Sequence, residues 1–223
     1  MGDNRPMTTT GSTRTVVRLL RHGEVHNPGG VLYGRLPGFR LSDLGRQMAE
    51  RVAEHLTGRD IVHLVSSPLQ RAQETAAPSA EALGLEPEVD ERVIEAANHF
   101  EGMTFGQGEG KLSNPRHWPY LRNPLEPSWG EPYKEISVRM LAAVDSARRA
   151  ARGHEALIVS HQLPIWTLRR TIEGKRLWHD PRNRECALAS LTTLTYEGDD
   201  PVSLSYSEPA ADLVARARPG AGA

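Results

Sequence analysis

Reactive side chains follow the first apolar run of the chain. Residues 15–21, TVVRLLR, are apolar and rich in β-branched residues, which predicts a buried strand. Arg21, His22, Gly23 and Glu24 stand at the end of this run. Taken alone, these residues could be a strand end that reaches water, so their role depends on which residues lie beside them in the fold.

Side chains of the same kinds follow two further predicted strands. Residues 61–67, IVHLVSS, lead to Arg71, and residues 156–160, ALIVS, lead to His161 and Gln162. The carboxyl ends of neighbouring parallel strands meet at one edge of a sheet, where ligands bind in open α/β folds. We therefore expect two histidines and two arginines to converge if these strands are neighbours.

Two guanidinium groups and two imidazoles in one place favour phosphate chemistry. Guanidinium groups bind anions that carry several oxygens, and helix N-termini after the strands add backbone N–H groups. A histidine can attack phosphorus when one ring nitrogen carries no proton and the other is held as a donor, usually by a carbonyl. Gly23 lacks a Cβ, so backbone can approach the ring or a ligand closely.

Amphipathic segments between the strands are expected to form helices that position these side chains. Ser42 is a predicted N-cap. Ser67 is a second one, with Pro68 at the first helical position and Gln70 completing a capping box. Gly84 is expected to end that second helix. The predicted helices cover residues 43–56, 68–83, 133–152 and 161–172.

The remaining strands complete an α/β fold. Residues 86–97 are expected to form a short strand that leads into a turn. Residues 186–196 and 202–206 are expected to form a hairpin at the end of the ordered chain. Strands that alternate with helices predict a three-layer α/β/α architecture with a mostly parallel central sheet.

Composition along the chain predicts one domain between a disordered N-terminal leader and a flexible C-terminal tail. Residues 1–14 are expected to be a disordered leader and residues 208–223 a flexible tail. The domain between them, residues 15–207, contains an irregular stretch at about 98–132 that is rich in Gly, Pro, Trp and Asn. A loop of this length inside a compact domain is typical of a lid or binding loop.

The overall charge argues against nucleic acid or a membrane as the partner. The 27 Lys and Arg residues balance 28 Asp and Glu residues, so the formal net charge is -1. Cys186 is the single cysteine, which excludes an intramolecular disulfide and favours a reducing cytoplasm. The sequence has no run of 18 apolar residues and no signal-peptide core at its start. No histidine and cysteine spacing indicates a metal site.

Five segments resemble the successive signatures of the histidine phosphatase superfamily, which has the phosphoglycerate mutase-like fold. They occur in the order LLRHGEVHN, LSDLGRQMAE, SSPLQRAQETA, VIEAANHFEG and IVSHQLPI, and span roughly residues 15–172. An Arg-His-Gly tripeptide alone is a weak signal, because short strings recur by chance. Five segments in order, each at the expected place in the fold, are a strong one.

The resemblance implies a role for each residue at the expected sheet edge. His22 would accept the phosphoryl group, and Glu95 would protonate the leaving group and then activate water. Arg21, Arg71 and His161 would bind the phosphoryl oxygens. The resemblance implies neither a metal ion nor another cofactor, because arginines and histidine supply the positive field.

Several assignments stay open at this point. The run EAANHFEG departs from the usual family spacing, so Glu101 competes with Glu95 for the role of proton donor. Asn27 and Gln162 are expected to bind the substrate or its phosphate, with Asn27 at the rim of the site. Some loop residues could line the substrate mouth or simply pack together; they are Tyr33, Arg35, Phe100, Trp118 and Trp129. The sequence does not fix the oligomeric state, and a homodimer is one option.

Three functions are compatible with these residues. The first is a metal-independent phosphatase that acts on a small phosphorylated metabolite. The second is a phosphoglycerate mutase. Mutases of the superfamily carry an ERHYG-like stretch at the acid and an AHGNS-like stretch at the second histidine, whereas this chain has VIEAANHF and SHQLPI, which favours hydrolysis. The third is a phospho-ligand binding protein without catalysis, which is disfavoured because all four core histidines and arginines are present.

Overall fold

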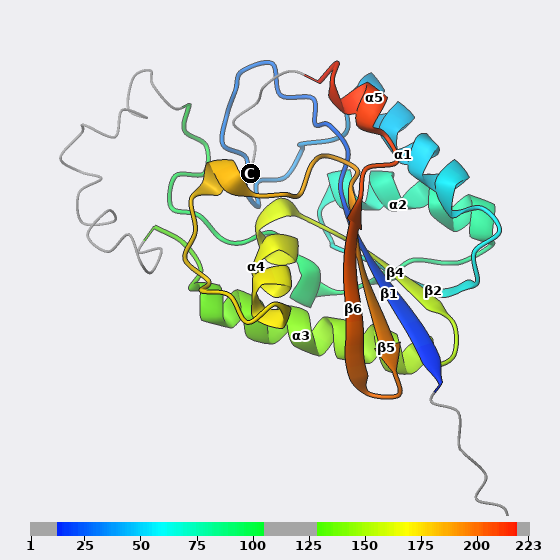
Figure 1. The fold of residues 1–223 in the computed structure, drawn as a ribbon. Coiled ribbons are helices and arrows are strands. Elements are labelled where there is room, and N and C mark those ends of the chain that lie inside the picture. The colour runs from blue at the N-terminus through cyan, green and yellow to red at the C-terminus, as the bar shows by residue number, and fades with distance from the viewer. Residues whose placement is uncertain (1–12, 105–128, 218–223) are drawn as a thin grey trace, which may run out of the picture.

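The computed structural model of the chain describes residues 13–104 and 129–217. A six-stranded sheet runs through its centre (Figure 1) in the order β3-β2-β4-β1-β5-β6. Most of the expected lid and leader lies outside the described residues. The strands are β1 (Arg14–Arg21), β2 (Ile61–Ser66), β3 (Glu88–Val89), β4 (Glu155–Ser160), β5 (Leu191–Glu197) and β6 (Asp200–Ser207).

The sheet is mostly parallel, as the alternation of strands and helices predicts. Strands β3, β2, β4 and β1 pair in parallel, while β5 and β6 form an antiparallel hairpin against β1. Residues that are buried on both faces dominate the parallel strands, because helices cover both sides of the sheet.

Helices on the two faces form separate apolar clusters. In Figure 1, α1, α2 and α5 cover one face of the sheet, while α3 and α4 cover the other. None of the helices in the described part of the chain is long and apolar enough to cross a membrane. The helices are α1 (Asp43–Leu56), α2 (Gln70–Leu83), α3 (Tyr133–Ala150), α4 (Gln162–Ile172) and α5 (Ala211–Val214), with short 3-10 turns η1 (Glu91–Val93) and η4 (Pro181–Asn183).

The predicted helix ends are only partly confirmed. Ser42 caps α1 by accepting a hydrogen bond from the Gly45 amide at 2.9 Å, and Gly84 ends α2 in the left-handed conformation with φ 66°. The prediction that Ser67 caps α2 is wrong: the helix begins at Gln70, and Leu69 holds the cap position without a side-chain bond. The Ser67 hydroxyl accepts a long bond of 3.4 Å from the Leu69 amide, just before the helix, and is 2.8 Å from Nε2 of His161.

Two predictions near the C-terminus also differ from the structure. The hairpin begins at Leu191, so residues 186–190 are a loop rather than part of a strand. Within the predicted flexible tail, α5 forms and buries Leu213 against the cluster of α1 and α2. Burial of this apolar side chain explains the order, because it offsets the conformational entropy that a free tail would retain.

The register of the central strands aligns the ends that carry the reactive side chains. Arg21 of β1 pairs with Ser160 of β4, and Ser66 of β2 pairs with Val159 of β4. Backbone bonds continue past the strands, because the His22 amide donates to the Ser160 carbonyl at 3.1 Å. His22, Ser67 and His161 therefore leave the sheet side by side, as the sequence predicts for the two histidines.

Close contact between two backbones explains the glycine after His22. A Cβ at Gly23 would lie 2.6 Å from the carbonyl oxygen of Gly45 in α1. The sequence suggested that Gly23 lets backbone approach the ring or a ligand, whereas the close neighbour in the structure is the backbone of α1. Next to it, the Glu24 carboxylate accepts a hydrogen bond from the Ser42 hydroxyl, which ties the loop to the start of α1.

We predict that Gly23→Ala destabilises the protein by about 1–3 kcal/mol, because the added methyl group forces β1 and α1 apart. Gly29→Ala is the matched control, since a Cβ there would make only an ordinary contact 3.5 Å from Val31. The control should change stability by less than about 0.5 kcal/mol. Urea unfolding of both variants measures the difference, and equal stabilities would contradict the packing argument.

Candidate active site

His22 is fully buried directly after β1. Its Nδ1 donates to the carbonyl of Gly23 at 2.8 Å, which places the lone pair of the neutral ring on Nε2. Nε2 is buried and has no hydrogen-bond partner among the described residues. Burial lowers the pKa of His22 well below 6.5, and the charges of Arg71 and Arg21 lower it further. The ring is therefore neutral near pH 7, with one nitrogen free to react.

His161 lies beside His22 at the start of α4. The two ring centroids are 5.1 Å apart, and Nε2 of His161 is 2.8 Å from the hydroxyl oxygen of Ser67. Its Nδ1 is buried and has no partner among the described residues. Burial lowers the pKa of His161 well below 6.5, with Arg71 as the next cause. Both histidines thus present an uncommitted ring nitrogen in a dry environment.

Two arginines bring positive charge to the histidine pair. Arg21 donates from Nη1 to the carbonyl of Cys186 at 2.7 Å, and Arg71 donates from Nη2 to the carbonyl of Gly34 at 2.7 Å. The Arg71 guanidinium also lies 4.7 Å from the centroid of the buried Tyr33 ring. Neither arginine forms an ion pair with a carboxylate of the described residues. Arg71 is fully buried and Arg21 is half-buried, and a cation removed from water without an ion-pair partner is costly, so this arrangement favours a bound anion.

Glu95 supplies a buried carboxyl group next to these charges. Its Oε1 accepts from the Ala96 amide at 2.8 Å, while Oε2 has no partner among the described residues. Burial raises the pKa of Glu95 above 4.5, and the Ala96 hydrogen bond and the charge of Arg71 act in the opposite direction. A carboxyl group with a raised pKa can hold a proton for transfer near neutral pH.

An ionic clamp holds the backbone at Glu95. Arg35 donates from Nε to the Glu95 carbonyl at 2.6 Å and from Nη2 to Glu131 at 2.8 Å. Arg139 of α3 donates to the other oxygen of Glu131 at 2.7 Å. Glu131 thereby links the loop that carries Arg35 to α3. This clamp fixes the main chain from which the Glu95 carboxyl projects.

The other predicted residues lie in less direct positions. The Glu101 carboxylate accepts from the Asn98 amide at 3.1 Å. The Asn27 side chain both donates to and accepts from the backbone of Val31, so it shapes its own loop. Gln162 donates to the Cys186 carbonyl at 3.3 Å. Contact of these side chains with a ligand stays a prediction.

Sequence reasoning missed several side chains of this region. Ser67 carries a capping signature, and nothing in that pattern indicates a bond to a histidine 94 residues away. The sequence suggests for Arg35 a place at the substrate mouth or simple packing, whereas in the structure it binds the backbone carbonyl of Glu95. Arg184 belongs to no motif, yet it donates to Gln162 at 3.3 Å and acts on the charge of Glu95. Trp118 lies outside the described residues.

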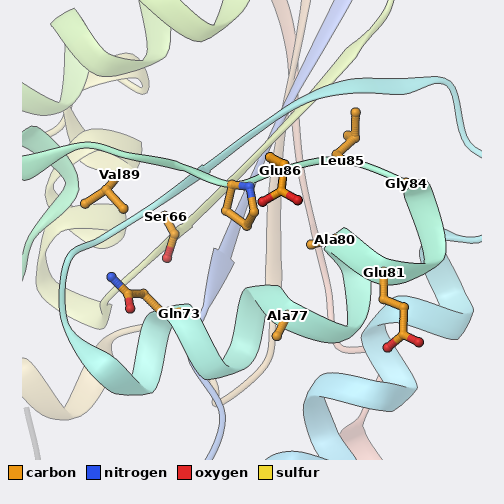
Figure 2. Close-up of a pocket in the computed structure, with 10 residues that line it drawn as sticks. Ser66, Gln73, Ala77, Ala80, Glu81, Gly84, Leu85, Glu86 and Val89 are labelled. Carbon is orange, nitrogen blue, oxygen red and sulfur yellow. The ribbon is translucent and has the colours of Figure 1, made fainter.

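Two hollows differ in their suitability for a phosphate ester. A cavity of about 90 Å³ is lined by Glu95, Trp129 and Arg184, among other residues. A larger hollow of about 580 Å³ lies between α2 and the segment that leads into β3 (Figure 2). The charged residues that line it are Glu81 and Glu86, which would repel phosphate. The smaller cavity is also lined by Gly34, whose carbonyl accepts from Arg71, and by Glu131, whose charge is paired with Arg35 and Arg139, so it is the better candidate.

Residues 17–209 match the histidine phosphatase superfamily, branch 1. The chain belongs to this superfamily. An uncharacterized protein of Mycobacterium tuberculosis is 59% identical over 197 residues, which cover 88% of this chain and 98% of that protein. A probable phosphoglycerate mutase of Yersinia enterocolitica is 30% identical over 186 residues, which cover 78% of this chain and 82% of the mutase.

Solved structures share the histidine phosphatase fold found here. YhfR of Bacillus stearothermophilus superposes with a TM-score of 0.71 at 26% identity, over 84% of this chain and 94% of YhfR. A mycobacterial glucosyl-3-phosphoglycerate phosphatase, solved as a complex with VO3, gives a TM-score of 0.65 at 28% identity, over 80% of this chain and 90% of that one. The α/β architecture with a mostly parallel sheet is therefore that of phosphoglycerate mutase-like proteins.

Proposed function

We propose that this protein is a phosphatase that hydrolyses phosphomonoesters of a small metabolite through a phosphohistidine on His22, without a metal ion. The observation that carries the proposal is the state of His22: Nδ1 is committed to the Gly23 carbonyl, and the buried Nε2 is left without a partner. A neutral imidazole held in this way is a nucleophile aimed by its hydrogen bond. Arg21 and Arg71 supply the charge that would hold a phosphoryl group beside it.

The first step transfers the phosphoryl group to the enzyme. The lone pair on Nε2 of His22 attacks phosphorus while the bond from phosphorus to the ester oxygen breaks. Glu95 gives its proton to the departing alkoxide, and the guanidinium groups stabilise the charge on the phosphoryl oxygens. His161, whose ring lies beside that of His22, binds the same phosphoryl oxygens.

The second step returns the enzyme to its starting state. Glu95, now ionised, takes a proton from water while the water oxygen attacks phosphorus, and the bond to Nε2 breaks. The products are inorganic phosphate and a protonated Glu95, so the residue acts first as acid and then as base. Its buried position supports both roles, because the raised pKa keeps the protonated form accessible near neutral pH.

Phosphoglycerate mutase activity is the second candidate, supported by the likeness to the probable mutase of Yersinia enterocolitica. The likeness to a glucosyl-3-phosphoglycerate phosphatase supports hydrolysis. An assay with the purified protein separates the two: release of inorganic phosphate from p-nitrophenyl phosphate against interconversion of 3- and 2-phosphoglycerate. We expect hydrolysis to exceed mutase turnover. The reverse order would exclude a phosphatase as the main activity.

We predict that Glu95→Gln lowers kcat/KM for alkyl phosphates such as glycerol 3-phosphate by about 10²–10⁴-fold. The loss for p-nitrophenyl phosphate should be smaller, because p-nitrophenolate leaves without being protonated. In the wild type, activity on alkyl phosphates should fall as the pH rises through the raised pKa of Glu95, and this alkaline limb should vanish in the variant. Because the pKa of His22 lies well below 6.5, no loss should appear at pH 6.5 from its protonation.

Glu101→Gln is the matched control, since Glu101 is the other proton-donor candidate that the sequence offers, and its carboxylate accepts from the Asn98 amide. It should keep the alkaline limb and most of the activity. If instead Glu101→Gln shows the leaving-group dependence and Glu95→Gln does not, the two assignments must be exchanged.

A further inference from the structure

Ser67 is a fully buried residue that directly follows β2. Its amide donates to the carbonyl of Val159 in β4 at 3.0 Å, which continues the pairing of the two strands. Its carbonyl accepts from the hydroxyl of Ser66 at 3.1 Å. Both polar groups of the Ser67 backbone are therefore bound, so the sheet holds the main chain from which the Ser67 hydroxyl projects.

The Ser67 hydroxyl lies between an amide and an imidazole. The Leu69 amide donates to Oγ of Ser67 in a long bond of 3.4 Å, and Nε2 of His161 lies 2.8 Å from the same oxygen. An amide N–H can only donate, so the Leu69 bond leaves the hydroxyl proton free for another partner. Within the described part of the chain, Nε2 of His161 is the acceptor that this proton can reach.

The Ser67 hydroxyl distinguishes the two tautomers of His161. Burial lowers the pKa of His161 well below 6.5, so the ring is neutral near pH 7 and carries one proton on its two nitrogens. If that proton is on Nε2, it points at the Ser67 oxygen and the buried hydroxyl proton has no acceptor. If the proton is on Nδ1, the hydroxyl donates to Nε2 and is fully satisfied. Buried polar groups are hydrogen-bonded in native proteins, which favours the proton on Nδ1.

Nδ1 of His161 is the ring nitrogen left for a ligand. It is buried and has no hydrogen-bond partner among the described residues. The ring lies beside that of His22, with centroids 5.1 Å apart, and the charges of Arg71 and Arg21 both act on it. The proposed function places the phosphoryl group among these side chains. An N–H group at Nδ1 would donate to a phosphoryl oxygen, whereas a lone pair there would repel it.

We propose that Ser67 is a positioning residue that holds His161 as the tautomer with its proton on Nδ1, so that the neutral ring donates a hydrogen bond to the phosphoryl group. The inference rests on the proposed function for the position of that group. His161 then binds an anion without carrying a positive charge, which its burial opposes. The two histidines would share one tautomer and use it differently: His22 reacts through the bare Nε2, and His161 binds through Nδ1–H.

Heteronuclear NMR of the imidazole nitrogens measures the tautomer directly, because a protonated ring nitrogen and a bare one differ widely in chemical shift. The signals of His161 are those that disappear in His161→Ala. In the wild type near pH 7 we expect a protonated Nδ1 and a bare Nε2. Ser67→Ala should protonate Nε2 in a large fraction of the molecules. Ser66→Ala is the matched control, since this neighbouring buried hydroxyl donates to a carbonyl instead, and it should leave the tautomer unchanged.

Equilibrium binding of inorganic phosphate to the same proteins tests the consequence for the ligand. We expect Ser67→Ala to weaken binding by about tenfold to a hundredfold, as for the loss of a hydrogen bond to a charged group. In a protein that already carries His161→Ala, the change Ser67→Ala should cause no further loss, because Ser67 acts only through the ring. Ser66→Ala should bind phosphate as tightly as the wild type.

Three results would overturn the role of Ser67. One is a protonated Nε2 of His161 in the wild type, and another is a tautomer that stays unchanged in Ser67→Ala. The third is a loss of phosphate binding from Ser67→Ala that is equally large in the His161→Ala protein, which would mean that the hydroxyl does not act through the ring. Ser67→Cys, with its weaker donor, replaces Ser67→Ala in these measurements if the latter does not fold.

The proposed function fails separately from this inference. Wild-type protein that releases no phosphate from any ester, but shows the Ser67-dependent tautomer and phosphate binding, would retain the role of Ser67 and lose the phosphatase assignment. Wild-type protein that hydrolyses p-nitrophenyl phosphate with a protonated Nε2 on His161 would do the opposite.

Discussion

The hydrogen bond from His22 Nδ1 to the Gly23 carbonyl is the constraint on which the candidate site depends. It fixes the tautomer of a neutral ring and leaves Nε2 as the free nitrogen. The carbonyl can lie there because the backbone at Gly23 packs tightly against Gly45 of α1, where a side chain would collide. The amide of His22 is in turn held by the carbonyl of Ser160. The register of the sheet, the packing of α1 and the orientation of the ring together fix the position of Nε2 of His22.

Burial gives the same site its electrostatic character. It lowers the pKa of both histidines well below 6.5, so both rings are neutral near pH 7, and it raises the pKa of Glu95 above its usual value. The arginines remain charged, and none of Arg21, Arg71 and Arg184 forms an ion pair with the described carboxylates. A site of this kind has a net positive field and little water to screen it, which suits an anionic ester. The cost of burying these cations is reduced because backbone carbonyls and neutral side chains accept hydrogen bonds from the guanidinium groups.

The sequence was sufficient to predict the strands and helices that carry His22, Arg71 and His161. Apolar strands and four-residue helical stripes are local patterns, and the ends of parallel strands must share one edge of the sheet. Ser67 shows where local patterns fail: α2 begins at Gln70, and the Ser67 hydroxyl lies 2.8 Å from His161 while it accepts only a long bond of 3.4 Å from the Leu69 amide. The same limit applies to α5, which forms because a partner surface for Leu213 exists.

Arg184 could not be found from the sequence, because its role depends on three segments that pack together. Its partners lie on α4 and in the loop that precedes η4, and the cavity that it lines is closed partly by Trp129. The predicted lid is untested over residues 105–128, which the structure does not describe. The spacing of the glutamates in the run EAANHFEG leaves both Glu95 and Glu101 as candidates for the proton donor. The burial of Glu95 and the charges around it favour Glu95 for this role.

The central claim is that Nε2 of His22 takes the phosphoryl group. Rapid mixing with excess p-nitrophenyl phosphate, an alkaline quench that preserves phosphohistidine, and peptide mass spectrometry test it most directly. The account predicts one phosphoryl group on the peptide that contains His22, and none in the His22→Ala protein. Turnover that continues while His22 stays unmodified, or a phosphoryl group found on another residue, would contradict it.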